Sequence, residues 1–203
     1  MADTKTPTQR PSLRDRNKEQ TRRALRDAAL KLFAVHGYDA TTTEEIAERA
    51  GVATRTLFRY FPTKEHILYY GEEDWVQDFV ETYPTQPATL SDLEALRVTL
   101  VGLTPRFAKS RQSLLLYRRA VKSSPALRGR EHDHQEQTIA ILAQAVAARR
   151  GRRKTDEASV LVASVGVLAY LRAQDQWLAG PANGSLARAI NKEFNLLYSQ
   201  FSR

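Results

Sequence analysis

Most of this chain repeats one pattern, in which a capping or helix-breaking residue is followed by apolar residues three and four positions apart. Over residues 17–36, for example, Leu25, Ala28 and Leu32 recur at this spacing, and Gly37 follows as a stop signal. No run of alternating β-branched and polar residues, typical of a strand, occurs anywhere. The pattern predicts an all-α fold of about nine helices.

Helix-breaking residues predict where the later helices lie. Two short helices are expected, one from about Thr43 to Gly51 and one from Ala53 or Thr54 to Phe61. One longer helix after Thr63 should hold both Ile67 and Val80. The remaining helices are expected between Pro and Gly separators, Pro105 among them, over residues 92–103, 105–122, 125–149, 156–179 and 185–201.

Composition divides the chain into three parts. Residues 1–14 are rich in Thr, Pro and Arg and almost lack apolar side chains, so we expect a flexible basic arm that either contacts DNA or is a solvated tail. Residues 15–66 predict a three-helix helix-turn-helix domain. Residues 67–203 predict a larger helical bundle for ligand binding and dimerisation.

The short helices flanking Gly51 are the most informative segment. Thr42 and Glu45 have the spacing of a capping box, and the small Ala47 lies where the two helices would touch. A plain helical hairpin would account for these features alone. However, the outward positions of the second helix carry hydrogen-bonding and basic side chains, which are the groups that read base edges in the major groove. We therefore interpret the segment as a DNA reader.

Charge and composition limit the cellular location of the protein and the kinds of partner and site it can have. The formal net charge is +8, which favours an anionic partner such as nucleic acid or an acidic membrane surface. There are no cysteines, so disulfides and thiolate metal sites are excluded. The apolar stretch 160–170 is about half the length needed to cross a bilayer, and the first residues lack the apolar core of a signal peptide. We expect a cytoplasmic protein without a membrane partner.

The run from Lys18 to Ile67 resembles the DNA-binding domain of the TetR (tetracycline-repressor) family of bacterial regulators. The matching elements are residues 28–33, 36–38, 41–43, 46–47, 50–52 and 57–65. The resemblance implies a homodimeric repressor that binds double-stranded operator DNA and responds to a small-molecule effector.

The resemblance also implies a set of DNA-binding residues. The residue starting the supporting helix should touch a phosphate, the first turn of the recognition helix should face base edges, and the positions after it should contact the groove wall and backbone. The expected set is Thr43, Thr54, Arg55, Thr56, Phe58, Arg59, Tyr60 and Lys64. Arg55 is the leading specificity residue, because bidentate pairing with guanine contributes about 1–3 kcal/mol. Arg59 is expected to reach either a guanine or a phosphate.

One position departs from the family pattern. Many relatives carry Ser or Thr where this chain has Ala53, so the recognition helix lacks the usual cap. Thr54 is the alternative cap, and in that role its side chain would turn away from the bases.

The last two helices, 156–179 and 185–201, are expected to form the dimer. The first is rich in small residues such as Ala163 and Gly166, and the second supplies bulk such as Phe194. An ordinary monomeric core is the alternative. We favour the dimer because one short recognition helix makes too few contacts for operator-level affinity.

An effector site is expected between the central helices. Apolar and aromatic side chains predict a mainly apolar cavity lined by Trp75, Phe79, Phe107, Leu114, Tyr117 and Trp177. The segment 117–128 loosely resembles regulators that bind acyl-coenzyme A-like ligands. The resemblance implies that its Arg and Lys residues contact phosphate groups of the ligand at the mouth of the cavity. The alternative is that they form a solvated helix face.

The expected function is a sequence-specific repressor whose operator binding is relieved by a small, largely apolar ligand. The alternatives are a non-specific nucleoid-type DNA-binding protein and a regulator of the same fold that acts as an activator. We expect no enzyme activity, no catalytic residues and no cofactor, because no nucleophile motif accompanies the four scattered histidines. Only His132 and Glu136 of the 131–136 cluster share a helix face, so no metal site is expected. The basic turn 149–154 is interpreted as a solvated helix junction.

Overall fold

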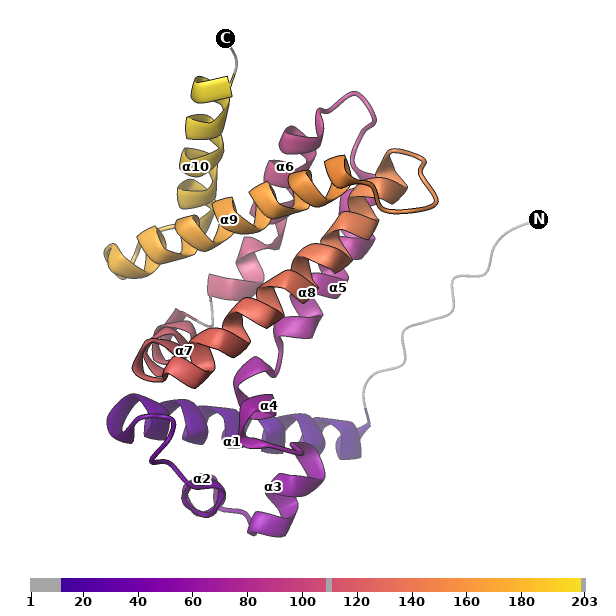
Figure 1. Ribbon diagram of the computed structural model, residues 1–203. Coiled ribbons are helices and arrows are strands. Elements are labelled where there is room, and N and C mark those ends of the chain that lie inside the picture. The colour runs from indigo at the N-terminus through magenta and orange to yellow at the C-terminus, as the bar shows by residue number, and fades with distance from the viewer. Residues whose placement is uncertain (1–11, 109–110, 202–203) are drawn as a thin grey trace, which may run out of the picture. The chain divides into compact units, whose positions relative to one another are not determined.

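The computed structural model describes residues 12–108 and 111–201, with the side chains of residues 72–73, 106–108 and 201 outside this description. The described residues form ten α-helices and one 3-10 helix, with no strand, which confirms the all-α prediction. The chain divides into two compact units, Met1–Leu68 and Tyr69–Arg203 (Figure 1). Most of the expected basic arm lies outside the described residues.

The first unit packs three helices around one small core. They are α1 (Leu13–His36), α2 (Thr43–Arg49) and α3 (Thr54–Tyr60), and α4 (Lys64–Tyr69) begins in the same unit. The helix α1 starts four residues earlier than predicted, because the Ser12 side chain accepts a hydrogen bond from the backbone N–H of Asp15 and caps it. Leu25, Phe33 and Ile46 are fully buried at the centre.

The second unit is a bundle of longer helices (Figure 1). Its elements are α5 (Glu72–Thr82), the 3-10 helix η1 (Tyr83–Thr85), α6 (Asp92–Ala108), α7 (Arg111–Ser123), α8 (Pro125–Arg149), α9 (Glu157–Ala179) and α10 (Leu186–Phe201). Figure 1 shows α8 and α9 side by side with opposite directions, and α10 packs against α6 and α9. Fully buried Phe79, Leu96 and Phe194 anchor the core. None of the described helices is long and apolar enough to cross a membrane.

Two further predicted helix boundaries are wrong, and both have local causes. The single helix expected after Thr63 is split into α4 and α5, since Gly71 adopts a left-handed conformation with φ of +86°. Conversely, α6 continues through Pro105. Proline cannot donate to the carbonyl of Val101, but the hydroxyl of Thr104 donates to that oxygen at 2.8 Å and satisfies it.

Candidate nucleic-acid interface

The helices α2 and α3 meet through a small buried core and a tight turn. Ile46, Ala47 and Leu57 are at most 1% exposed. The turn between the helices uses Gly51 at φ +70°, and the N–H of Val52 donates to the carbonyl of Ala47 at 3.0 Å. These contacts fix the angle between the helices, which is the geometric requirement of a helix-turn-helix.

The two helices begin differently. Thr42 caps α2 through the predicted capping box: its hydroxyl accepts from the N–H of Glu45, and the Glu45 carboxylate accepts from the N–H of Thr42 at 2.8 Å. These hydrogen bonds hold the pKa of Glu45 below its usual value. Ala53 is the N-cap of α3 and offers no side-chain hydrogen bond. Thr54 is therefore the first helical residue rather than the alternative cap.

The outward face of α3 carries Arg55, Phe58 and Arg59, which are one turn apart and share one side of the helix. Both arginines are exposed, and neither has an acidic partner among the described residues. The Phe58 side chain is 48% exposed, which is unusual for an aromatic ring of this size. Guanidinium groups and an apolar ring together match guanine acceptors and thymine methyl groups in a major groove.

The neighbouring threonines are less exposed than the arginines. Thr54 and Thr56 on α3 and Thr43 on α2 are all half-buried. The hydroxyl of Thr43 donates to the carboxylate of Glu44 at 3.1 Å. A hydroxyl hydrogen can rotate, so each of these groups can turn its single donor toward a phosphate oxygen or a base acceptor, and its lone pairs can accept from a base amino group.

Tyr60 ends α3 beside two guanidinium groups. The guanidinium carbon of Arg59 lies 5.1 Å from the centre of the Tyr60 ring, and that of Arg22, on α1, lies 5.7 Å from it. These distances are within the range of cation–π interactions. Arg22 was not among the residues expected from the sequence. No motif or helical spacing in α1 identifies it, since only the packing of α1 beside α3 brings it to this ring.

Lys64 is engaged within the protein. Its ammonium group donates to the backbone carbonyls of Tyr38 at 2.7 Å and Thr41 at 2.8 Å, and it lies 4.2 Å from the centre of the Tyr38 ring. The side chain thus ties the start of α4 to the turn after α1. An ammonium group has three donors, so one remains for an outside acceptor.

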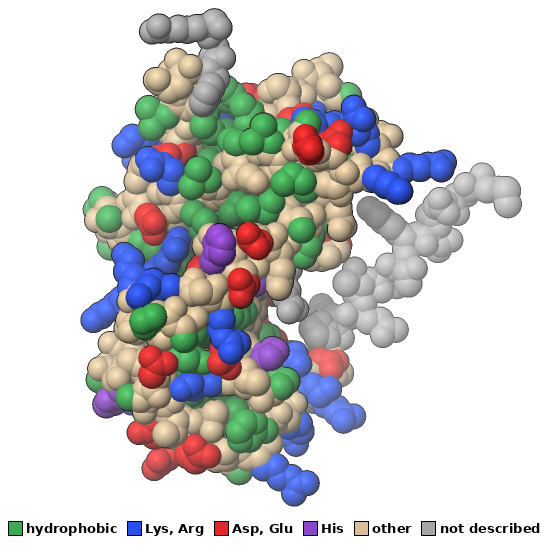
Figure 2. Space-filling view, viewed as in Figure 1, with side chains coloured by type: hydrophobic (Ala, Val, Ile, Leu, Met, Phe, Trp, Pro, Cys, Tyr) green, Lys and Arg blue, Asp and Glu red, His purple; other side chains and the backbone are tan. Residues whose placement is uncertain are grey.

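Charge is unevenly distributed over the first unit. Figure 2 shows Lys and Arg side chains along the edge where α3 and the N-terminal half of α1 lie, and acidic side chains over α2. The acidic residues of α2 include Glu44, Glu45 and Glu48, all exposed. A polyanion is therefore attracted to the α3 edge rather than to the α2 surface.

The expected effector residues do not all lie together. The Phe79 ring stacks on Tyr83 at 5.2 Å, and Arg149, at the end of α8, lies 5.7 Å from the Tyr83 ring. Tyr117 instead donates its hydroxyl to Glu131, near the start of α8. Positions 131 and 149 are about 27 Å apart along the helix axis. Tyr117 therefore contacts α8 far from the end that Tyr83, the stacking partner of Phe79, contacts.

Trp75, Leu114 and Trp177 belong, like Phe79, to the hydrophobic core of the second unit. Trp75 lies 5.4 Å from the Tyr170 ring, and Leu114 packs at the edge of the core. Trp177 is 5% exposed and donates its indole N–H to the carbonyl of Gly184 at 3.0 Å. The side chain of Phe107 lies outside the described residues.

The Arg and Lys residues of segment 117–128 were expected at a cavity mouth or on a solvated face, and sequence reasoning missed the partner of Arg118 on α9, Gln174. The Arg118 guanidinium donates to the amide oxygen of Gln174, which is 7% exposed, at 3.3 Å, and it lies 3.4 Å from a carboxylate oxygen of Asp175. The available signal is Gln174 itself, a polar residue among the buried positions of a mainly apolar helix. Near Tyr117, the rings of Tyr69 and His134 lie 4.7 Å apart.

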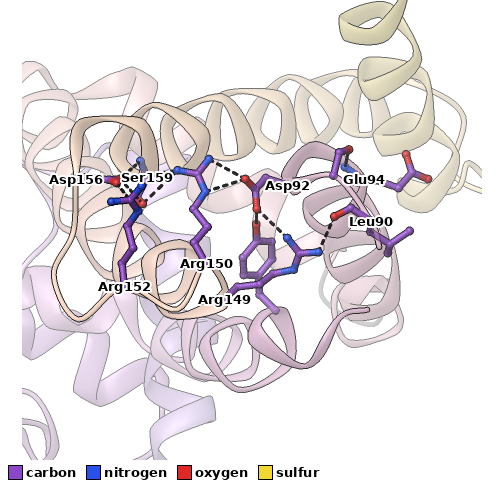
Figure 3. A network of polar contacts seen from close by, with 10 residues as sticks. Leu90, Asp92, Glu94, Arg149, Arg150, Arg152, Asp156 and Ser159 are labelled. Atoms are coloured by element: carbon purple, nitrogen blue, oxygen red, sulfur yellow. Dashed lines mark hydrogen bonds and ion pairs between the residues drawn. The ribbon is translucent and has the colours of Figure 1, made fainter. Parts of the chain in front are cut away.

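The basic turn after α8 is not simply a solvated junction. Arg149 is only 8% exposed in its side chain and donates to Asp92 at 2.8 Å and to the carbonyl of Leu90 at 2.7 Å. Arg150 donates to the other oxygen of Asp92 at 2.8 Å, and the hydroxyl of Tyr83 also donates to Asp92 (Figure 3). Burial, with the neighbouring carboxylate second, raises the pKa of Tyr83. Asp92 with its three donors Tyr83, Arg149 and Arg150, here called the Asp92 hub, joins the start of α6 to the end of α8.

The small residues of α9 serve packing inside the unit. Ala163 is fully buried, and a Cβ added to Gly166 would lie 3.1 Å from the Leu96 side chain, so this stripe admits a close approach of α6. Phe194 on α10 is also fully buried. The expectation that these residues face a partner subunit is therefore wrong, because their surface is already covered within the chain.

The 131–136 segment holds one loose ion pair. His132 lies 3.6 Å from Glu136, and both side chains are exposed. Within residues 12–108 and 111–201, the acidic and histidine side chains form no group of three that could hold a metal ion.

Comparison with known proteins matches both units. Residues 25–69 match the model of the bacterial regulatory proteins of the tetR family, and residues 90–202 match the MftR C-terminal domain. The regulator TcmR of Streptomyces glaucescens is 30% identical over 161 residues, which is 74% of this chain and 71% of that protein.

Solved structures share the fold. A complex of SmeT with triclosan aligns with a TM-score of 0.62 at 18% identity, covering 89% of this chain and 90% of that one. FadR of Bacillus subtilis with stearoyl-CoA aligns with a TM-score of 0.56 at 22% identity, covering 87% and 97%. The helix-turn-helix geometry, the two matching models and the similarity to TcmR agree that this chain belongs to the TetR family of bacterial transcriptional regulators.

Proposed function

We propose that the protein is a sequence-specific, operator-binding repressor that releases DNA when a small, largely apolar ligand binds. The observation that carries the proposal is the outward face of α3, where exposed Arg55 and Arg59 have no acidic partner among the described residues and Phe58 is 48% exposed. Such a face carries cations without a counter-ion in the described part of the chain, and it matches the edges of base pairs. Residues 15–66 form the reader, and residues 67–203 bind the ligand and the second subunit in the cytoplasm.

The reading and positioning roles divide along α3. Arg55 pairs with a guanine, and Thr54 and Thr56 face neighbouring base edges in the first turn. Phe58 contacts a thymine methyl group at the groove wall. Thr43 donates to a phosphate at the start of α2, and Tyr60 contacts the backbone.

A homodimer through α9 and α10 completes the reader. Val160, Leu161 and Leu168 on α9 are exposed, at 42%, 65% and 60%, and Leu196 on α10 is 47% exposed. Apolar side chains this exposed on two adjacent helices support burial against a second copy. Two recognition helices spaced about 34–36 Å apart would then read two half-sites on one face of the duplex.

The effector binds within the second unit, next to Tyr117. Aromatic rings from several elements gather there and along α9, and Arg118 and Gln174 supply polar contacts in an otherwise apolar interior. SmeT with triclosan and FadR with stearoyl-CoA share the fold, and each of these ligands has a large apolar part. A ligand that prefers one subunit spacing shifts the pair of recognition helices away from operator-competent spacing.

Selection from a random duplex library tests the DNA part of the proposal. We expect one pseudo-palindrome to be recovered and protected as a single footprint at physiological salt. Uniform coating of shuffled DNA, lost steeply with salt, would instead indicate a nucleoid-type protein. Transcription from a promoter that carries the site distinguishes repression from activation.

Release from the selected duplex tests the ligand part. Fluorescence anisotropy of the labelled duplex is followed while triclosan, stearoyl-CoA and free coenzyme A are added. We expect release by at least one apolar compound and none by free coenzyme A. Release by free coenzyme A alone would contradict an apolar effector.

A further inference from the structure

Arg22 and Arg59 come from different helices and meet at one tyrosine ring. Their guanidinium carbons lie 5.7 Å and 5.1 Å from the centre of the Tyr60 ring. Both groups carry a positive charge beside the same ring, so a phosphate within reach of both would accept a charge-assisted hydrogen bond from each. The geometry points to a phosphate-binding clamp formed by Arg22, Arg59 and Tyr60, which extends the DNA contact to α1. This inference rests on the proposed function.

The position of the clamp fits a backbone phosphate rather than a base. Arg59 lies one helical turn after Arg55 on the outward face of α3, and Tyr60 follows it at the helix end. A guanidinium oriented by the Tyr60 ring lies beside the base-reading residues, at the side of the groove. Arg59 therefore contacts a phosphate rather than a guanine, and Arg55 is the arginine of α3 that contacts a guanine.

The chemistry of the three groups is suited to phosphate. A guanidinium group has five N–H donors, so Arg22 can keep its contacts within the protein and still donate to a phosphate oxygen. The Tyr60 hydroxyl adds a neutral donor. Lys64, expected together with Tyr60 to hold the DNA backbone, already gives two of its three donors to the carbonyls of Tyr38 and Thr41. Arg22 therefore supplies the second full cation at this site.

Salt dependence of DNA binding measures the clamp directly. Each phosphate contact contributes about 0.9 to the slope of log affinity against log salt, so Arg22→Gln should lower the slope of a dimer by roughly 2. The same relation gives about a thirtyfold loss of affinity at 0.15 M salt. The loss should be equal for the duplex recovered by selection and for a shuffled duplex, because phosphate contacts carry no sequence information.

The matched control is Lys31→Gln. Lys31 is exposed and lies two and a half turns further along α1, on the opposite face from Arg22. It removes the same charge from the same helix, and the salt slope should stay at the wild-type value. Equal slopes for Arg22→Gln and Lys31→Gln would overturn the clamp.

Arg22 could also support folding through the Tyr60 ring, and Arg22→Lys separates the two roles. Slopes are measured well below the thermal unfolding temperature of each full-length variant, so a loss of stability alone leaves the slope unchanged. Arg22→Lys retains the cation and should retain the wild-type slope, and a slope as low as that of Arg22→Gln would contradict the assignment. Wild-type protein that bound selected and shuffled duplexes equally would defeat the proposed function instead.

Discussion

Arginines in the two units are used in opposite ways. On α3, Arg55 and Arg59 are exposed and have no acidic partner in the described part of the chain. At the end of α8, Arg149 and Arg150 are paired with the two oxygens of Asp92. The difference shows that a basic residue stays available to an outside anion where its charge is left uncompensated, and serves the fold where a carboxylate is supplied.

The largest expected effect comes from removing the carboxylate of the hub. Asp92→Ala leaves Arg149, whose side chain is 8% exposed, buried without its counter-ion. Breaking a buried pair from one side costs about 3 kcal/mol or more. Urea unfolding should show this loss, and Glu136→Ala, at an exposed carboxylate of α8, should leave the midpoint unchanged. Equal midpoints for the two variants would show that the hub is not structural.

An intermediate effect is expected at the recognition helix. Arg55→Ala should cost about 1–3 kcal/mol of operator affinity for each half-site, through loss of guanine recognition. It should not lower the unfolding temperature, because no described residue depends on the Arg55 side chain. Anisotropy titrations with the selected duplex and with one guanine replaced measure the effect. If Arg55→Ala still discriminates between these duplexes, another residue reads that base pair.

A smaller effect on stability is expected from adding a cap to α3 or removing the cap of α2. Ala53→Ser should supply the missing cap of α3 and raise stability by about 0.5–1 kcal/mol, and Thr42→Ala should remove the cap of α2 and lower it by about 1 kcal/mol. Thermal unfolding of both variants checks the signs. Destabilisation by Ala53→Ser would mean that the start of α3 cannot accept a side-chain cap.

The smallest effect is a pH dependence in the second unit. Hydrogen bonds from Arg97 and Tyr198 hold the pKa of Glu94 below its ordinary value of 4.5. A lowered carboxyl pKa adds stability above the unfolded value, and this contribution disappears as the pH falls through the lower folded value. Wild-type protein should therefore lose stability relative to Glu94→Gln as the pH falls below 4.5. Parallel acid unfolding curves would exclude a role for Glu94.

Local patterns in the sequence were sufficient for most of the helices and for the reader. The capping box at Thr42 and the turn at Gly51 depend on residues within a few positions, so their chemistry is visible in the sequence. Two helix boundaries that differ from the prediction also have local causes. Gly71 divides α4 from α5, and the hydroxyl of Thr104 lets α6 continue through Pro105.

Long-range packing decided the rest. The sequence by itself determined an all-α chain with a helix-turn-helix, because helical periodicity and capping are short-range properties. Only the tertiary structure brought Arg22 to the Tyr60 ring, Arg149 to Asp92 and Leu96 against Gly166. Each pair joins residues on separate helices, and whether a charge is compensated or a small residue is covered depends on which helices pack together.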